Sequence, residues 1–144
     1  MLLCSQVMKR RVHSTKPALT VAEAARIMKE SLIGFLPICD PAGHPLGVIT
    51  DRDIVLRAIA ADLPGTTQVE EIMSRDPVRC HADTPLVEAE ELMLKRKTRR
   101  ILIVDAADHL TGLITLSDIA QHQQPFEAAR WYRELSSMRF RFEK

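Results

Sequence analysis

Two short stretches of the chain place a hydroxyl and a carboxylate three residues apart, directly after a glycine and two apolar residues. They read GVITDRD over residues 47–53 and GLITLSD over residues 112–118. The residues that could do chemistry in them are Thr50, Asp53, Thr115 and Asp118. At the turn from a strand into a helix, unpaired amides and a threonine hydroxyl suit a phosphate oxygen, and an acceptor-only carboxylate can take both hydroxyls of a ribose. The same spacing also fits an ordinary capping box, in which the acid accepts from the amide of the N-cap residue.

The two stretches are related but not equivalent. Arg52 in the first corresponds to Ser117 in the second, and either side chain can reach a phosphate, although only the arginine adds charge. Gly47 and Gly112 are expected to let a ligand approach the backbone, because no side chain stands in the way. We therefore expect two candidate sites of unequal strength.

These stretches belong to an internal repeat. When the sequence is shifted by 65 residues, residues 8–54 align with residues 73–119 without a gap, and fourteen of forty-seven positions are identical. Ordinary composition predicts about three identities. The identical residues of the first copy are Met8, Arg10, Glu23, Ala24, Met28, Ile38, Asp40, Ala42, His44, Gly47, Ile49, Thr50, Asp53 and Ile54. The repeat indicates one duplicated structural unit.

Each copy is predicted to form a strand, a helix, two strands and a helix. One helical face is predicted from the apolar residues Val21, Ala24, Ala25 and Met28, and in the second copy from Leu86, Ala89 and Met93. Thr20 with Glu23 predicts a capping box, and Thr84 before Pro85 predicts an N-cap with proline at the first helical position. Strands are expected at 35–39 and 46–49, and at 101–104 and 111–114. The closing helices are expected over 51–61 and 116–123.

The sequence resembles the tandem cystathionine-β-synthase-like (CBS) domain pair, also called the Bateman module. The resemblance rests on TVAEAARIM, LPICD and GVITDRDI in the first copy and on PLVEAEELM, ILIVD and GLITLSDI in the second. It implies an α/β (α+β) fold in which two β-α-β-β-α units pack as a pseudo-twofold pair. The expected ranges are 1–64 for the first unit, 65–124 for the second and 125–144 for a C-terminal helix.

The resemblance also implies a function. Such pairs bind adenosine nucleotides or related adenosyl ligands in clefts between the repeats, regulate a partner protein, often form flat homodimers and do not catalyse. The expected regulatory ligands are AMP, ADP, ATP, NAD and S-adenosylmethionine. No prosthetic group is expected.

The residues entering the central strand differ most between the copies. Ile33 and Gly34 in the first copy correspond to Thr98 and Arg99 in the second, with Arg100 following. By resemblance, these positions contact the base and the phosphate of a ligand. The run KRKTRR over 95–100 is either a solvated helix end, where cations oppose the macrodipole, or a rim that attracts phosphate. No aromatic residues interleave with its charges, which disfavours nucleic acid.

Composition limits the remaining possibilities. The net charge of +1 gives no general attraction to nucleic acid or membranes, and no apolar run is long enough to span a bilayer. Three widely spaced cysteines argue against a disulfide framework and favour the cytoplasm. Neither the repeated His44 and His109 nor the adjacent Cys80 and His81 forms a metal-site pattern, and no catalytic motif is present. A non-enzymatic protein is therefore expected.

The last twenty residues hold five of the six aromatic residues. A helical seam is predicted there from Ala128, Trp131, Leu135, Met138 and Phe142. It is expected to pack on the module or its dimer mate, with docking to another protein or to a membrane surface as alternatives. For the whole chain, the alternatives to a ligand sensor are a structural dimerisation module with vestigial clefts and a nucleic-acid-binding protein.

Overall fold

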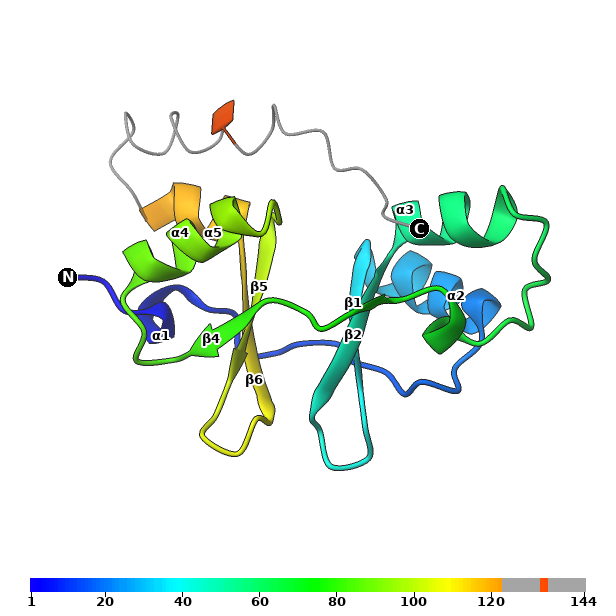
Figure 1. The fold of residues 1–144 in the computed structure, drawn as a ribbon, viewed down its shortest axis with the longest axis horizontal. Helices are drawn as coiled ribbons and strands as arrows, with labels where there is room; N and C mark the ends of the chain where they lie inside the picture. The colour runs from blue at the N-terminus through cyan, green and yellow to red at the C-terminus, as the bar shows by residue number, and fades with distance from the viewer. Residues whose placement is uncertain (123–132, 135–144) are drawn as a thin grey trace. The chain divides into compact units, whose positions relative to one another are not determined.

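The computed structural model of the 144-residue chain describes residues 1–122 and 133–134 (Figure 1). Apart from residues 133–134, the helix predicted over 125–144 therefore lies outside the described residues. The described chain folds into two compact units, numbered so that unit 2 holds most of the first sequence copy and unit 1 most of the second. Unit 2 contains His13–Pro77 together with Asp108–Leu110. Unit 1 contains Met1–Val12, Val78–Ala107 and the described residues from Thr111 onward.

Unit 2 is a three-stranded sheet with helices. Its elements are α2 (Val21–Ser31), β1 (Phe35–Cys39), β2 (Pro45–Thr50), α3 (Asp51–Asp53), η1 (Ile54–Ile59), η2 (Val69–Glu71) and β3 (Ser74–Arg75). The strands lie in the order β1-β2-β3, with β2 antiparallel to both neighbours. The alternating burial of β2 reflects one face on the core and one face outward.

Unit 1 repeats this plan with its own sheet. Its elements are α1 (Cys4–Val7), β4 (Arg79–His81), α4 (Leu86–Lys95), β5 (Arg100–Val104), β6 (Leu110–Thr115) and α5 (Leu116–His122), with only the first residue of β6 grouped in unit 2. The order is β4-β5-β6, and β4 runs parallel to β5. The predicted mixed fold with two similar units is therefore confirmed.

One predicted helix start is confirmed, a second differs in its N-cap residue, and a third helix differs in type. Thr20 caps α2 in a capping box with Glu23, as predicted. Helix α4 instead has Pro85 as its N-cap, because the Thr84 hydroxyl accepts a hydrogen bond from the His81 amide. The helix predicted over 51–61 is a single α turn followed by a π-helix, in which the Ala60 amide donates to the Val55 carbonyl.

The first strand predicted in the first copy is present only as an isolated bridge. Thr15 forms only an isolated parallel bridge with Ile38, whereas the second copy has the full strand β4 at the corresponding place. Thr15 still exchanges backbone hydrogen bonds with β1 on both sides of Ile38. The pairing is thus present in both copies but extends further in the second.

The N-terminal segment completes unit 1. In unit 2, β3 pairs with β2 at Val48; in unit 1, the corresponding position Leu113 pairs with Lys9. Likewise Thr20 bridges Gln68 in unit 2, and Pro85 bridges Leu3 in unit 1. Residues 3–9 therefore occupy in unit 1 the place that residues 68–74 occupy in unit 2. The compact units follow this pairing, so residues 65–77 lie in unit 2 although they begin the second copy in sequence.

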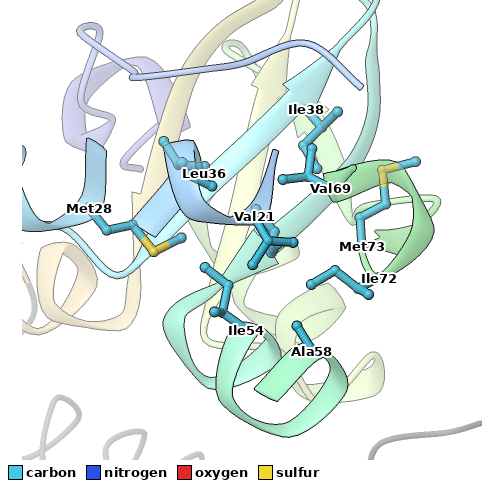
Figure 2. Close-up of a cluster of buried hydrophobic side chains, with 11 residues drawn as sticks. Val21, Met28, Leu36, Ile38, Ile54, Ala58, Val69, Ile72 and Met73 are labelled. Atoms are coloured by element: carbon cyan, nitrogen blue, oxygen red, sulfur yellow. The ribbon is translucent and has the colours of Figure 1, made fainter. Parts of the chain in front are cut away.

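Each unit has its own apolar core. Figure 2 shows that of unit 2, where side chains from α2, β1 and η1 meet those of the η2 segment. Its buried residues are Val21, Ala24, Met28, Leu36, Ile38, Ile49, Ile54, Ala58, Val69, Ile72 and Met73. In unit 1 the N-terminal residues Cys4, Val7 and Met8 join the core of α4, β5, β6 and α5. The predicted helix faces are buried except for Ala25, which is exposed because the buried stripe of α2 is narrower than its apolar spacing suggested.

Candidate functional site

The start of α3 in unit 2 is held by a complete set of local hydrogen bonds. The Thr50 amide donates to Asp53 Oδ2 over 2.9 Å, and the Asp53 amide donates to Thr50 Oγ1 over 3.0 Å. Between them, the Asp51 amide donates to the Gly34 carbonyl, and the Arg52 amide donates to Asp51 Oδ1. All four amides of residues 50–53 therefore have acceptors within the chain.

The start of α5 in unit 1 has the same capping box. The Thr115 amide and hydroxyl both donate to Asp118 Oδ2 over 2.8 Å, and the Asp118 amide donates to Thr115 Oγ1 over 3.3 Å. The Leu116 amide donates to the Arg99 carbonyl over 2.9 Å. Each threonine hydroxyl is thus engaged by its own aspartate.

These contacts overturn one step of the sequence argument. The turn was expected to offer unpaired amides to an anion, but local acceptors take the amides because the aspartate and threonine cap each other. The capping-box alternative is present in both copies. If these residues bind a ligand, they must therefore do so through atoms that the caps do not use.

The second oxygen of each aspartate is not used by the cap. Asp118 Oδ1 lies 3.2 Å from Lys9 Nζ, and Asp53 Oδ1 lies 3.8 Å from Arg57 Nε. Both aspartates are buried, at 5% and 4% exposure. Since an ionised carboxylate has about four acceptor positions, one oxygen can hold the cap while the other accepts from a ligand hydroxyl. In unit 1 such a hydroxyl would displace the ammonium group of an exposed lysine.

The predicted strand-entry residues lie beside these helix starts. Gly34 and Arg99 occupy equivalent places, each accepting a backbone hydrogen bond from the first helical residue. Arg99 is exposed and Arg100 half-buried at the start of β5. Ile33, in contrast, packs against the apolar core of unit 2. The structure therefore brings Gly34 to one helix start and Arg99 to the other, and directs Ile33 to the core.

The two helix starts differ in charge. Asp51 is the first residue of α3, and its carboxylate lies so close to Gly34 that a Cβ there would be 2.9 Å from Asp51 Oδ2. The equivalent first residue of α5 is the buried Leu116. A carboxylate therefore lies at the start of α3 in unit 2, whereas the start of α5 in unit 1 has an apolar side chain and lies beside the arginine-bearing run.

The repeated glycines serve packing, not ligand approach. A Cβ on Gly47 would lie 2.5 Å from Met73 Sδ and 2.7 Å from the Ser74 carbonyl oxygen. A Cβ on Gly112 would lie 2.8 Å from Met8 Sδ and 3.1 Å from the Lys9 carbonyl oxygen. The expectation that these glycines open space for a ligand is therefore wrong. The repetition of Met8 as Met73 in the aligned copies was the sequence signal for this contact.

A groove of about 690 Å³ on unit 1 was not predicted. It is lined by Met8, Arg10, His81, Ala82, Asp83, Val104, Asp105, Ala106 and Thr111. None of these residues was a predicted site residue. Three of them, Met8, Arg10 and Asp105, are identical in the two aligned copies.

The turn histidines have a structural explanation within unit 2. The rings of His44 and His109 stack, with centroids 4.9 Å apart and planes 10° apart. His44 is further fixed by Asp40, whose carboxylate lies 2.8 Å from His44 Nδ1. Among the described residues, no cluster of three or more His, Cys, Asp or Glu side chains could hold a metal ion. Within the same residues, no helix is both long and apolar enough to cross a membrane.

Comparison with known proteins defines the family. The CBS domain family matches residues 4–59 and residues 69–124, so the chain belongs to the CBS domain family. A curated relative is the CBS domain-containing protein YhcV of Bacillus subtilis, 37% identical over 122 residues. That alignment covers 85% of this chain and 86% of the relative.

Three solved structures share the fold. The CBS domain pair of protein MJ0100, in complex with 5′-methylthioadenosine and S-adenosyl-L-methionine, has a TM-score of 0.76 and 28% identity, covering 83% of this chain and 98% of that one. Hypoxic Response Protein I with two coordinated zinc ions has a TM-score of 0.77 and 30% identity, covering 85% and 100%. CBSX2 in complex with AMP has a TM-score of 0.73 and 26% identity, covering 84% and 95%.

Proposed function

We propose that this CBS domain pair is a regulatory module that binds an adenosyl ligand carrying phosphate, with Asp118 at the start of α5 as the main ribose contact. The observation that carries the proposal is that Asp118 Oδ1 takes no part in the helix cap and is paired only with the ammonium group of the exposed Lys9, 3.2 Å away, among the contacts described. The adenosyl ligands of MJ0100 and CBSX2, two proteins of the same fold, support the ligand class.

The charge distribution supports unit 1 as the stronger site. The Arg99 carbonyl accepts a hydrogen bond from the amide of Leu116, the first residue of α5, and Arg100 follows at the start of β5. An arginine can bind a phosphate with two parallel hydrogen bonds. We assign the phosphate to these arginines and to Ser117, and the ribose to Asp118, while Thr115 positions the carboxylate. AMP, ADP and ATP fit this arrangement best.

Unit 2 is proposed as a weaker or differently selective site. Thr50 and Asp53 repeat the cap, and Arg52 adds a positive charge, but the Asp51 carboxylate at the start of α3 opposes a phosphate. An uncharged or cationic adenosyl ligand avoids that repulsion. We therefore propose that S-adenosylmethionine is favoured over AMP, ADP, ATP or NAD at this unit.

The output is proposed to be regulation of a partner protein through a homodimer, without catalysis by this chain. Unit 2 exposes three apolar residues on η1, namely Val55, Leu56 and Ile59, at 56%, 38% and 62%. Such a contiguous apolar surface favours association with another protein surface. The equivalent residues of the second copy are Ala120, Gln121 and Gln124, so this association surface is confined to unit 2.

A structural dimerisation module is the second candidate, because both aspartates already serve as helix caps in the described structure. A nucleic-acid-binding role through the basic run is the weakest candidate and predicts affinity that falls steeply with salt.

A thermal-shift panel tests the proposal. The full chain is heated with AMP, ADP, ATP, NAD and S-adenosylmethionine, each over a concentration series. A ligand at a hundred times its dissociation constant stabilises the native state by about 2.7 kcal/mol, so the midpoint should rise by several degrees with at least one nucleotide. No response to any of the five compounds would favour the structural candidate.

A further inference from the structure

Two cysteines that are far apart in sequence meet inside unit 1. Cys4 Sγ and Cys80 Sγ lie 3.8 Å apart, although 76 positions separate them along the chain. Cys4 is fully buried in α1, whereas Cys80 in β4 is partly exposed. Both are free thiols in the structure. The more accessible sulfur therefore lies in contact with a sheltered one.

The backbone fixes this contact. The Cys4 amide donates to the Thr84 carbonyl over 2.9 Å, and the Ser5 amide donates to the Ala82 carbonyl over 2.8 Å. Both acceptors lie in the turn that directly follows β4. The backbone segments that carry the two sulfurs are therefore hydrogen-bonded to each other. The short distance between the sulfurs is set by the fold and does not depend on the rotamers of two surface side chains.

The fold does not require sulfur at these places. The positions equivalent to Cys4 and Cys80 in the other unit are Val69 and Thr15, and Val69 is just as fully buried as Cys4. An ordinary apolar residue and a hydroxyl residue therefore satisfy the same packing. The thiol pair is a feature of unit 1 alone, which points to a chemical use and not to a packing need.

We propose that Cys4 and Cys80 form a reversible disulfide under oxidation by hydrogen peroxide, fixing the N-terminal segment to β4. In the first step the Cys80 sulfur attacks the peroxide O–O bond, giving a Cys80 sulfenic acid and one water. In the second step the Cys4 sulfur attacks the Cys80 sulfur; the departing hydroxide takes the Cys4 proton and leaves as a second water. The two thiols lose two electrons and the peroxide gains them.

The sulfur environment suits the second step. The hydrogen bond from Cys80 lowers the pKa of Cys4, against the opposing effects of burial and of the Glu90 carboxylate, and the same bond raises the pKa of Cys80. A thiolate is the attacking species in disulfide formation. The raised pKa of Cys80 slows the first step, so that step is assigned to Cys80 on its exposure, since Cys4 is buried. To form the bond, the sulfurs must approach by roughly 1.8 Å from their present contact.

The disulfide would act on the segment that completes unit 1. Met8 packs against Gly112, and Lys9 pairs with Leu113 and reaches Asp118. Covalent closure of a long loop restricts the unfolded chain and favours the state in which this segment is docked. Oxidation should therefore raise the thermal midpoint by several degrees and slow hydrogen exchange at residues 3–9. This inference does not depend on ligand binding.

The test compares the full chain with three matched variants. Cys4→Val and Cys80→Thr each introduce the residue found at the same place in the other unit, and Cys39→Val introduces the residue found at Val104. Each protein is treated with hydrogen peroxide, and its thiols are titrated before and after reduction. Peptide mapping then identifies the linkage, which lowers the mass by two hydrogen atoms.

The expected result is a Cys4–Cys80 linkage in the native chain and in Cys39→Val, reversed by dithiothreitol, with a raised thermal midpoint. Cys4→Val should instead accumulate sulfenic acid at Cys80, trapped with dimedone. The proposal is overturned if the folded chain gives no Cys4–Cys80 peptide. It is also overturned if the Cys4–Cys80 disulfide of the folded chain forms no faster than the disulfides to Cys39 that form in the urea-unfolded chain.

Discussion

At the residue scale, the two capping aspartates combine a structural role with a proposed binding role. In each, Oδ2 accepts from the N-cap amide and Oδ1 faces a cation. The sequence alone predicted both roles as alternatives, because the same spacing serves a capping box and a ribose contact. In the structure the cap uses only Oδ2, so the capping role does not exclude the proposed contact of Oδ1 with a ligand.

The capping role of Asp53 is testable through stability. Asp53→Ala removes the acceptor of the Thr50 amide and should lower the free energy of unfolding by about 0.5–2 kcal/mol. Urea denaturation followed by circular dichroism measures this. Thr50→Ser keeps the hydroxyl that receives the Asp53 amide and should cost much less. Equal stability of Asp53→Ala and the parent chain would argue against the cap.

Asp40 gives a pH-dependent prediction. Hydrogen bonds to the ionised carboxyl, first from the His44 amide and then from its ring, hold the pKa of Asp40 below its ordinary value. A depressed folded-state pKa contributes stability that is present above the unfolded value of about 3.9 and is lost as the pH falls through the folded value. Asp40→Asn should therefore be less stable than the parent chain at pH 6, and the difference should shrink toward pH 2.5. Urea midpoints across this range measure it; a difference that stays constant would contradict the linkage.

At the element scale, the N-terminal segment and the η2–β3 segment are equivalent pieces that close the two sheets. Each brings a methionine over a glycine of the central hairpin, Met8 over Gly112 and Met73 over Gly47. The glycines are therefore needed by packing between elements, and substitution should act through that contact.

Gly47→Ala should destabilise more than Gly112→Ala. The added Cβ at position 47 meets a backbone oxygen at 2.7 Å as well as a sulfur, and a paired strand cannot move as easily as a methionine side chain. Overpacking of this kind costs about 1–3 kcal/mol. Unfolding free energies in urea measure both variants, and Gly65→Ala, whose Cβ would meet only the Ala22 side chain at 3.2 Å, is the control. A larger loss for Gly112→Ala would contradict this account.

Local patterns predicted most elements but not how distant segments pair. The strands at Phe35–Cys39 and Arg100–Val104 and the cap at Thr20 follow from apolar runs and capping chemistry within a few residues. The π-helix, the bridge of Lys9 to Leu113 and the Cys4–Cys80 contact depend on tertiary packing. The sequence shows a charged Asp51 where the second copy has the apolar Leu116. That these residues lie beside Gly34 and Arg99 could be learned only from the structure.

At the scale of the whole molecule, the two units share a plan and differ in surface chemistry. Unit 1 has the basic run and the thiol pair, whereas unit 2 has the Asp51 carboxylate and the apolar η1 surface. Duplication thus gives two similar scaffolds with separate proposed uses: an anionic ligand and redox control at unit 1, and association at unit 2.

The association surface can be tested with residues borrowed from the other copy. Ile59→Gln and Leu56→Gln introduce the residues found at the equivalent positions, and both should weaken the proposed homodimer by removing apolar contact area. Sedimentation velocity over a concentration series measures the shift toward monomer. Leu32→Gln changes an apolar residue outside η1 that is even more exposed, at 92%, and should leave the assembly unchanged. Unaltered sedimentation of both η1 variants would exclude this surface.

The central claim is that an adenosyl nucleotide binds at the start of α5 through Asp118. Isothermal titration of AMP into the parent chain, Asp118→Asn and Asp53→Asn tests it most directly, because both variants keep an oxygen for the cap and lose the charge. A hydrogen bond to a charged group is worth about 1.5–3 kcal/mol, so Asp118→Asn should weaken AMP binding by roughly tenfold or more, while Asp53→Asn should change it by less than about threefold. Absence of AMP binding to the parent chain, or equal losses in the two variants, would contradict the account.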